Sequence, residues 1–382
     1  MKTLGIVCEY NPFHNGHKYH IAESKRLLGC DTAVCAMSGS LVQRGEIAVF
    51  DKWTRAKNAV ENGADLVLEI PAFFCLQSGE KYAYGAVSVL NLLGNVDYLS
   101  FGSECGDIDF LQKIAEIKRK KSFNDTVKTL MQSGMSYPSA TEKAIGKFLD
   151  NSFGERIFSP NDLLGVEYIS AVYKTKSKVR PVTVKRHLTE HSGGKPVGNF
   201  ASASEIRKMI FEGADFDKFL PYSAKNYEIF DENNAESLIL GYFRLKCAEK
   251  NILGGETGMA NRLIKSAKIS NSLDEFYSNA TSKRYTESRI KRMSKCAFFD
   301  VKKNSVLDYI RPLAMNERGR KLLKNSPGKN LIVTKTADFN GSKNSMFKYD
   351  ILATDFAYLC ANDKTKRMSG ADFYTPPVYI KN

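Results

Sequence analysis

The first hundred residues alternate between short apolar runs and longer amphipathic segments. The apolar runs have the usual length of buried strands and cover residues 3–8, 32–37, 66–70 and 98–101. The segments between them space their apolar residues as amphipathic helices do and cover residues 16–28, 51–62 and 78–93. Strands and helices that alternate in this order form a parallel sheet covered by helices on both faces. The pattern therefore predicts an α/β fold with a doubly wound parallel sheet of the Rossmann type.

The carboxyl ends of the predicted strands form the expected functional edge of the sheet. Parallel sheets of this kind bind ligands in the loops that follow their strands. In this chain those loops follow Cys8, Met37, Ile70 and Phe101. We therefore expect active-site residues at these places.

The pattern changes after residue 220, where strands become scarce. Basic amphipathic helices dominate there, for example over residues 257–269 and 282–297. We place a domain boundary near residue 220, between an α/β domain of residues 1–220 and a basic, mainly helical domain of residues 221–382.

The net charge of +14 comes from 56 Lys and Arg against 42 Asp and Glu, and it is unevenly distributed. Residues 1–220 carry 28 basic and 25 acidic side chains, whereas residues 241–335 alone carry 21 basic and 8 acidic ones. A basic region of this density favours a polyanionic partner such as nucleic acid. A solvated, lysine-rich helical surface is the alternative.

Composition and cysteine spacing exclude several classes of protein. A hydrophobic fraction of 43% is incompatible with wholesale disorder, and no apolar run reaches the ~18 residues of a membrane span. The N-terminus lacks the long apolar stretch of a secretory signal peptide. The eight cysteines form no C-x-x-C pair, which argues against a zinc ribbon. We expect a cytoplasmic protein without a membrane segment.

Three of the five histidines cluster directly behind the first predicted strand, at positions 14, 17 and 20. Gly16 allows close backbone approach where the next helix begins, and the free N–H groups and dipole of that helix favour an anion. His14 and His17 share one side of a turn, where their imidazoles can donate hydrogen bonds to phosphate oxygens. Structural surface histidines and a metal site are the alternatives. No acidic ligands surround the cluster and H-E-x-x-H is absent, so we predict no metal ligand.

The loop NPFHNGH at residues 11–17 resembles the H-x-G-H signature of adenylyl-transferring nucleotidyltransferases. A second signature of those enzymes, I-S-S-T-x-I-R, opens a later helix, and residues 201–207 resemble it. The matching positions are Ser202, Ser204 and Arg207, and the departures are Ala201 and Ala203. Hydroxyls at a helix N-terminus, with a fork-shaped guanidinium, suit the β- and γ-phosphates of ATP.

Longer stretches resemble one family, the bacterial tRNA(Met) cytidine acetate ligases. These stretches are GIVCEYNPFHNGHKYH, MSGSLVQRGEIAVFDKWTRAKNAVENGADLVLEIP, FGSE, SPND, KRH and YIRPLAMNERG, and together they span residues 1 to about 325. Cys8, Ser40 and Ile47 depart from the family pattern, which has an aliphatic residue, Asn and Pro there. The resemblance implies a nucleotidyltransferase-like catalytic domain of the HUP class, followed by a basic tRNA-binding domain.

Members of this family use ATP to activate acetate as acetyl-adenylate and transfer the acetyl group to the wobble cytidine of elongator tRNA(Met). The resemblance thus implies ATP as a substrate with Mg²⁺ as its companion, acetate and elongator tRNA(Met) as partners, and no obligate protein partner. It implies an ATP-binding loop made of Val7, Cys8, Glu9, Tyr10, Asn11, Pro12, Phe13, His14, Asn15, Gly16, His17, Lys18, Tyr19 and His20. The residues that would complete the nucleotide pocket are Gly102, Asn161, Arg186, His187, Ser202 and Ser204.

Four residues receive hypothetical catalytic roles. His14 and His17 would stabilise charge on the α-phosphate as acetate attacks, and Arg207 would hold the leaving pyrophosphate. Lys52 would pair with acetate or phosphate, and a helix-surface lysine is the alternative. The loop of residues 43–46 could serve as a lid, as an RNA contact or as a plain Arg–Glu pair.

The basic second half supplies the candidate nucleic-acid contacts. Basic side chains bind phosphates, and an interleaved aromatic residue can stack on an unpaired base. The candidates are Lys283, Arg284, Tyr285, Arg289, Lys291, Arg292, Arg311 and Arg318. Two other functions stay open: an adenylyltransferase for a phosphorylated cofactor precursor, and a non-catalytic RNA-binding protein.

Overall fold

The computed structural model describes residues 2–149, 159–186, 196–247 and 251–381. One seven-stranded sheet with the order β5-β4-β1-β2-β3-β6-β7 forms its centre. The strands are β1 (Thr3–Cys8), β2 (Thr32–Ser38), β3 (Leu66–Ile70), β4 (Tyr98–Ser103), β5 (Arg180–Lys185), β6 (Pro312–Met315) and β7 (Val378–Tyr379). The four strands predicted in the first hundred residues are confirmed.

Five strands of the sheet run parallel to one another. Strand β1 pairs with β2 and β4, β2 pairs with β3, and β4 pairs with β5. Strand β6 joins β3 in the antiparallel direction, with an irregularity between Val67 and Leu68, and β7 lies parallel to β6. Because the five parallel strands point the same way, their carboxyl ends meet at one edge, as predicted.

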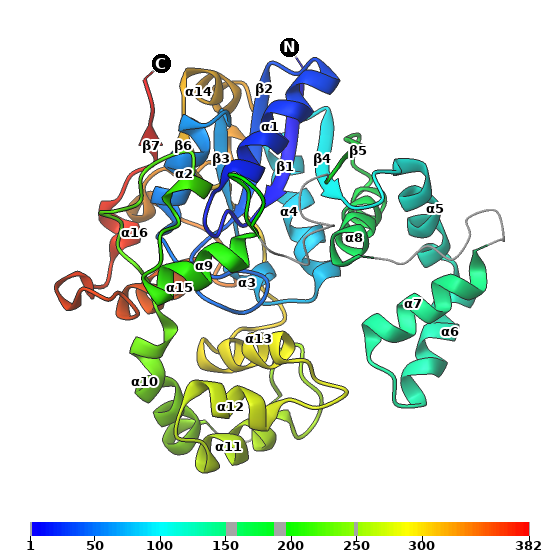
Figure 1. The fold of residues 1–382 in the computed structure, drawn as a ribbon, viewed down its shortest axis with the longest axis vertical. Helices are drawn as coiled ribbons and strands as arrows, with labels where there is room; N and C mark the ends of the chain where they lie inside the picture. Colours follow the sequence, from blue (N-terminus) through cyan, green and yellow to red (C-terminus); the bar gives the residue numbers. More distant parts are fainter. Residues whose placement is uncertain (1, 150–158, 187–195, 248–250, 382) are drawn as a thin grey trace.

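The helices cover both faces of this sheet (Figure 1). They are α1 (Asn15–Leu28), α2 (Lys52–Glu61), α3 (Ala72–Cys75), α4 (Gly79–Leu93), α5 (Ile108–Arg119), α6 (Lys121–Gln132), α7 (Tyr137–Phe148), α8 (Pro160–Lys174), α9 (Ala203–Glu212), α10 (Glu236–Gly241), α11 (Met259–Ile269), α12 (Leu273–Ala280), α13 (Glu287–Phe298), α14 (Glu317–Lys324), α15 (Phe347–Leu359) and α16 (Ala371–Tyr374). Shorter helical turns are Asp217–Phe219, Glu232–Ala235, Tyr242–Lys246, Lys329–Leu331, Thr336–Asp338 and Lys364–Lys366. None of the helices in the described residues is long and apolar enough to cross a membrane.

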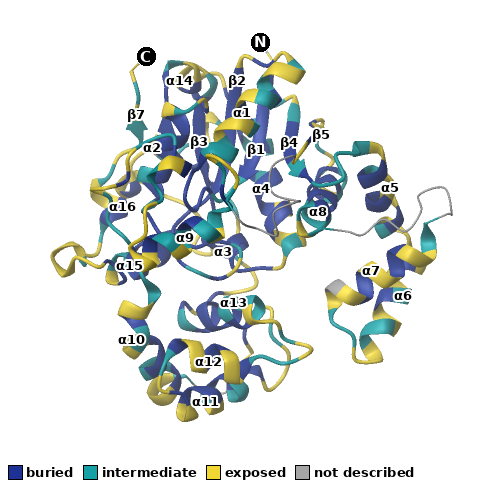
Figure 2. Cartoon of the chain, in the orientation of Figure 1, coloured by how far each residue is buried: buried dark blue, intermediate teal, exposed yellow. Residues whose placement is uncertain are grey.

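Alternation along the strands divides the core between the two faces of the sheet. Val34 and Leu68 belong to the apolar cluster that includes α4 and α8, whereas Cys35 and Val67 belong to the one that includes Ile21 of α1 and residues of α2. The strands are accordingly buried from both sides, and Figure 2 shows them as a dark core beneath partly exposed helices. This arrangement confirms the predicted α/β class with a doubly wound, mainly parallel sheet.

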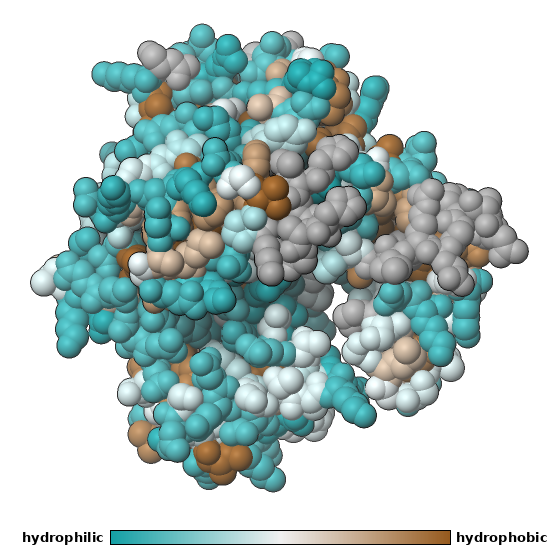
Figure 3. All heavy atoms as spheres, in the orientation of Figure 1, coloured by the Kyte–Doolittle hydropathy of each residue, from teal (hydrophilic) through white to brown (hydrophobic). Residues whose placement is uncertain are grey.

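The second half of the chain is mainly helical, but it also completes the sheet. Helices α10 to α13 lie together below the sheet in Figure 1, and the surface over them is predominantly hydrophilic in Figure 3. The chain then returns, because β6 and β7 extend the sheet and α15 packs against α3. Residues on both sides of position 220 therefore share one sheet. The division into a catalytic domain of residues 1–220 and a tRNA-binding domain of residues 221–382 stays a prediction.

Candidate active site

The site begins at the loop between β1 and α1, where two histidines cap the helix. The backbone N–H of Gly16 donates to Nδ1 of His14 at 3.1 Å, and the backbone N–H of His14 donates to Nδ1 of His17 at 3.2 Å. The two rings stack with centroids 3.6 Å apart. A ring nitrogen that accepts a hydrogen bond carries no proton, so both neutral imidazoles hold their proton on Nε2. The two rings thereby offer neighbouring Nε2–H donors to one anion.

Local packing explains the residues between these histidines. A Cβ atom at Gly16 would lie 2.9 Å from Cε1 of His14, so a side chain there would displace the capping ring. The Asn11–Pro12 peptide bond is cis, and Oδ1 of Asn11 accepts a 2.8 Å hydrogen bond from the backbone of Val49. Phe13 is fully buried and packs edge-on against Tyr10. Asn11 and Phe13 thus anchor the loop in the protein core, while His14 and His17 lie at the carboxyl-end edge of the sheet.

The histidines of this loop are uncharged near neutral pH. Burial, followed by the charge of Arg186, lowers the pKa of His14 to about 3 and that of His20 to about 4. Burial also lowers the pKa of His17 well below its usual value, and His14, Arg186 and His20 add to this effect. A neutral imidazole with its proton on Nε2 still donates one hydrogen bond. The predicted contact with a phosphate oxygen therefore does not require a charged histidine.

These pKa values predict how stability depends on pH. An unfolded histidine titrates near pH 6.5, so between about pH 4 and 6.5 the unfolded chain binds protons that the folded protein does not. The free energy of unfolding should therefore fall as the pH is lowered through this range, by about 1.4 kcal/mol per pH unit for each buried histidine. Denaturant titrations of wild type and His20→Asn at several pH values in this range measure the effect. The variant should show the smaller slope, and equal slopes would contradict the neutral state of His20.

The second predicted phosphate-binding motif lies beside the histidine loop. Ser202 caps α9, since its hydroxyl accepts from the backbone N–H of Glu205 at 3.1 Å. Arg207 reaches across from α9 and donates to the backbone oxygen of Asn11 at 2.8 Å, and it also contacts the hydroxyl of Ser204 at 3.4 Å. The structure therefore brings together two motifs that are almost two hundred residues apart in sequence, as predicted.

The opposite side of the site lies at the end of β4. A Cβ atom at Gly102 would lie 3.2 Å from Cγ of Arg186, so Gly102 makes room for that side chain. Glu104 accepts a 2.6 Å hydrogen bond from Asn161 and lies 3.8 Å from Arg186. Glu104 thus orients two predicted nucleotide-binding residues. It was not among the predicted site residues, although the FGSE stretch that contains it was noted.

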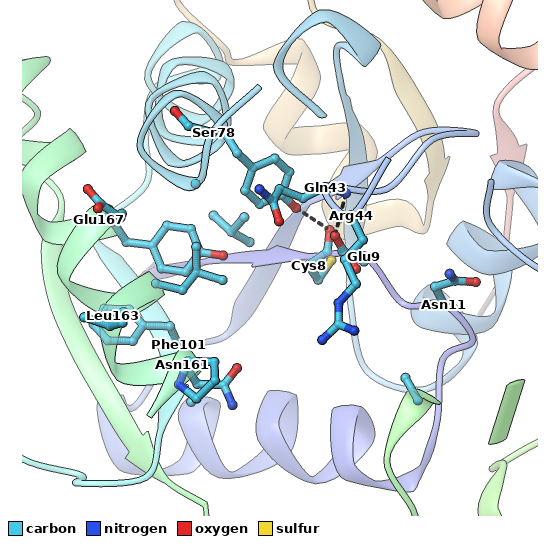
Figure 4. Close-up of a pocket in the computed structure, with 18 of the residues that line it drawn as sticks. Cys8, Glu9, Asn11, Gln43, Arg44, Ser78, Phe101, Asn161, Leu163 and Glu167 are labelled. Atoms are coloured by element: carbon cyan, nitrogen blue, oxygen red, sulfur yellow. Dashed lines mark hydrogen bonds between the residues drawn. The ribbon is translucent and has the colours of Figure 1, made fainter. Parts of the chain in front are cut away.

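One cavity of about 940 Å³ connects these elements (Figure 4). Among the described residues, the predicted ATP-binding positions in its wall are Val7, Cys8, Glu9, Tyr10, Asn11, His14, Gly16, His17, Tyr19, His20, Gly102, Asn161, Arg186, Ser202 and Arg207. The predicted positions outside its wall are Pro12, Phe13, Asn15, Lys18 and Ser204. Phe13 belongs to the core, and Asn15 instead donates to the backbone oxygens of Asn199 and Lys218. His187 lies outside the described residues.

Helix α13 and the turn before it close the cavity from the side of the second half of the chain. Arg284, Arg289 and Arg292 all line it. The loop of residues 43–46 docks onto this helix: Glu46 pairs with Lys291 at 3.0 Å, and Arg292 donates to the backbone oxygen of Gln43 at 3.0 Å. The loop thus holds the basic helix α13 against the sheet. From the sequence, a lid, an RNA contact or an Arg–Glu pair is expected for this loop, and none of these predicts its contact with α13.

Gly45 allows the loop of residues 43–46 to lie directly against the backbone of α13. Its φ angle is +81°, and a Cβ atom there would lie 2.6 Å from the backbone nitrogen of Arg292. A larger residue would therefore force the loop and the helix apart.

Two predicted site residues instead form a buried ionic cluster, and their predicted roles are wrong. The Lys52 ammonium lies 2.8 Å from Glu69 and 2.8 Å from Asp372, and its side chain is 0% exposed. Arg311 lies 2.7 Å from the same Asp372 and 3.4 Å from Glu69. Burying these charges requires such pairing, so neither cation is available to acetate or RNA. Ser40, a departure from the family pattern, is likewise buried and hydrogen-bonded to Thr354.

Arg318 lies at the opposite edge of the sheet from the cavity, so the structure does not bring it together with the other candidate RNA contacts, and its role stays a prediction. It is exposed on α14 and donates to the backbone oxygen of Asp31, the residue just before β2. The amino ends of the parallel strands form that edge, whereas the cavity lies at their carboxyl ends. Of the remaining predicted contacts, Lys283 is exposed, and Tyr285 lies partly buried with the guanidinium of Arg289 4.8 Å from its ring centroid.

Comparison with known proteins identifies the family. The family model of the HIGH nucleotidyl transferases matches residues 1–372. The tRNA(Met) cytidine acetate ligases of Thermosipho africanus and Clostridium novyi are 37% and 36% identical to the chain, over 98% and 100% of its length and 99% and 100% of theirs. The chain belongs to the tRNA(Met) cytidine acetate ligase family.

Solved structures of the same family share the whole fold. The apo crystal structure of Thermotoga maritima TmcAL superposes with a TM-score of 0.88 at 31% identity, and each chain is covered completely. A second crystal structure of that protein, bound with alpha-thio ATP, gives a TM-score of 0.87 at 30% identity with the same coverage. Family membership confirms the predicted class of enzyme, an ATP-dependent ligase of the nucleotidyl transferase type, and favours it over the two alternatives.

Proposed function

We propose that this enzyme activates acetate with ATP as acetyl-adenylate and then acetylates the exocyclic amine of the wobble cytidine in elongator tRNA(Met). The observation that carries the proposal is a single cavity whose wall combines the His14–His17 pair with three arginines of the basic second half. A site for ATP alone does not need that second set of cations, whereas a site that also receives RNA does. The names of the relatives support the same substrate.

In the first step, acetate attacks the α-phosphate of ATP and pyrophosphate leaves. His14 and His17 donate from their Nε2 atoms to the α-phosphate oxygens, where charge builds up in the transition state. Arg207, next to them, holds the leaving pyrophosphate with Ser202 at the start of α9, and Ser204 contacts the Arg207 guanidinium. Neither histidine acts as a nucleophile.

The nucleoside of ATP occupies the side of the cavity formed by the end of β4. Gly102 makes room for the side chain of Arg186, and Asn161 and Arg186 supply polar contacts to the ribose or adenine. Glu104 holds both of these side chains in place through its carboxylate.

Mg²⁺ belongs to the proposal as the companion of ATP. Among the described residues, no group of three or more His, Cys, Asp or Glu side chains is placed to hold a metal ion. The triphosphate oxygens would then supply much of the coordination, as is common for Mg²⁺ in nucleotide sites.

The decisive experiment is mass spectrometry of tRNA after incubation with the enzyme, ATP and isotope-labelled acetate. We expect one labelled acetyl group on the wobble cytidine of elongator tRNA(Met), and none when ATP is omitted. Unlabelled cytidine in every tRNA would refute the function. Acetate-dependent pyrophosphate release distinguishes this enzyme from an adenylyltransferase for a cofactor precursor.

Helix α13 and its preceding turn should provide part of the electrostatic affinity for tRNA. Because each phosphate contact releases counterions, Arg289→Gln should weaken tRNA binding and reduce the slope of log K against log salt by about 1. Binding titrations at several salt concentrations measure both quantities. Arg318→Gln is the matched control, since Arg318 is exposed at the opposite edge of the sheet, and it should leave the slope unchanged. Equal slopes for wild type and Arg289→Gln would contradict the role of α13.

A further inference from the structure

The cavity extends well beyond the two ATP motifs. Its volume of about 940 Å³ is near the upper end of the usual range for small-molecule sites. Away from α1, its wall is largely aromatic and apolar, with Tyr82, Phe101, Leu163 and Tyr168. Aromatic walls of this kind accept a flat base by stacking. In Figure 4, Leu163 lies across the pocket from Cys8 and Glu9. With the nucleoside of ATP at the end of β4, the acceptor base would lie against Tyr82 of α4 and Tyr168 of α8.

Glu9 lies between this acceptor side and the histidine loop. It follows β1 directly and stands five positions before His14. Two contacts fix it: the backbone N–H of Gln43 donates to Oε1 at 2.8 Å, and Arg55 donates to the backbone oxygen at 2.6 Å. Among the described residues, no hydrogen bond is formed by Oε2. Oε1 is therefore held by the Gln43 backbone, and Oε2 is left for a substrate.

Glu9 differs from the other carboxylates in the cavity wall. Among the described residues these are Glu80 and Glu167, and each has a cationic partner: Lys174 lies 3.4 Å from Glu80, and Lys118 pairs with Glu167. No ion pair engages Glu9 in the part of the chain that the structure describes. Burial raises the pKa of Glu9, although the Gln43 N–H, Arg207 and Arg44 favour its charged form and Glu46 opposes it. A carboxylate with a raised pKa is a better proton acceptor near neutral pH.

The neighbouring histidines cannot take this role in the neutral state. Nδ1 of His14 and Nδ1 of His17 already accept backbone hydrogen bonds, so their free Nε2 atoms carry protons and act as donors. His20 uses its Nε2 in a 3.0 Å contact with the hydroxyl of Ser100. Among the described residues of the cavity wall, Glu9 thus offers a carboxylate oxygen that forms no hydrogen bond, beside the histidine loop.

We propose that Glu9 is the general base of the acetyl-transfer step and accepts the proton of the cytidine amine through Oε2. This inference rests on the proposed function. As the amine nitrogen bonds to the acetyl carbon, the bond from that carbon to the phosphate oxygen breaks, and AMP leaves with the bonding electrons. The amine loses one proton, which passes to the Glu9 carboxylate. A carboxylate is also a fitting acceptor for the N4 amino group that marks cytosine.

The test separates the two half-reactions in Glu9→Gln. The amide oxygen of glutamine can still accept from the Gln43 N–H, so the loop keeps its geometry while the base is lost. Acetate-dependent ATP–pyrophosphate exchange should fall much less than acetyl transfer does, because Glu9→Gln keeps the shape of the ATP-binding loop. Single-turnover transfer of acetyl from the enzyme-bound adenylate to elongator tRNA(Met) should fall about 10²-fold or more. Glu212→Gln, which changes an exposed carboxylate at the end of α9 outside the cavity wall, should leave both steps unchanged.

The possible outcomes distinguish a general base from a folding defect and from failure of the proposed function. A loss of transfer much larger than that of exchange supports the base, because a folding defect would remove both. An equal loss of both steps, or transfer at the wild-type rate, would overturn the inference. If wild-type enzyme exchanges pyrophosphate but transfers no acetyl group to tRNA, the proposed function itself has failed, whatever Glu9 does.

Discussion

His17→Asn should lower the rate of acetate-dependent ATP–pyrophosphate exchange about 10²- to 10³-fold, the usual cost of removing one donor that stabilises transition-state charge. Asparagine places an oxygen close to the position of the histidine Nδ1, so it can still accept the hydrogen bond from the His14 backbone. What it removes is the Nε2–H group that faces the cavity. The expected loss is therefore one of catalysis, with the capping of α1 retained.

His17→Ala provides the comparison for this experiment. It removes both the donor and the cap, so it should lose exchange activity as His17→Asn does and also about 1 kcal/mol of stability. Thermal melts of the two variants separate these effects. Near-wild-type exchange in His17→Asn would show that the histidine serves only to begin the helix, and the phosphate role would then be wrong.

Lys52→Met should lower the free energy of unfolding by about 3–5 kcal/mol, since it leaves buried carboxylates without their full complement of cations. Glu69 and Asp372 each lie 2.8 Å from the Lys52 ammonium, and within the described part of the chain Arg311 is the one cation left to pair with them. Methionine keeps most of the side-chain volume, so the loss reports on charge more than on packing. Denaturant titration measures it.

Lys57→Met is the matched control on the same helix. Lys57 is half-exposed and lies 3.7 Å from Glu61, one turn away. Exposed pairs of this kind contribute about 0.3–0.5 kcal/mol, so the control should unfold almost as wild type does. A loss below about 1 kcal/mol in Lys52→Met would contradict the buried cluster.

The ionic cluster also explains why the end of the chain matters to the site. Asp372 lies on α16, Arg311 immediately precedes β6, and Glu69 belongs to β3. Their pairing with Lys52 joins α2 to the last quarter of the chain beneath the functional edge of the sheet. Arg55, one turn further along α2, is fully buried and donates to the backbone oxygens of Glu9 and Ser38, at the ends of β1 and β2. Helix α2 thus supports the active site without lining it.

Elements with local signals could be predicted from the sequence alone. The strands over residues 3–8 and 66–70 are continuous apolar runs, and such runs need burial on both faces wherever the sheet forms. The histidine loop was equally predictable, because its capping bonds join residues two and three apart. The Ser202–Arg207 motif contains its own cap, so its place at a helix N-terminus also followed from sequence.

Which charged residues face the cavity depends on contacts between distant parts of the chain. Lys52 and Arg311 resemble exposed cations in sequence, and their partner Asp372 lies 320 and 61 positions away, too far for any local pattern to reveal. Arg318 belongs to the same basic stretch as Arg289, yet the chain passes from one edge of the sheet to the other between them. Strands β6 and β7 are too short for a clear alternation, and they exist because the edge of β3 offers unpaired backbone groups. Burial and long-range pairing are properties of the folded chain. They distinguish the buried, paired cations Lys52 and Arg311 from the arginines that line the cavity.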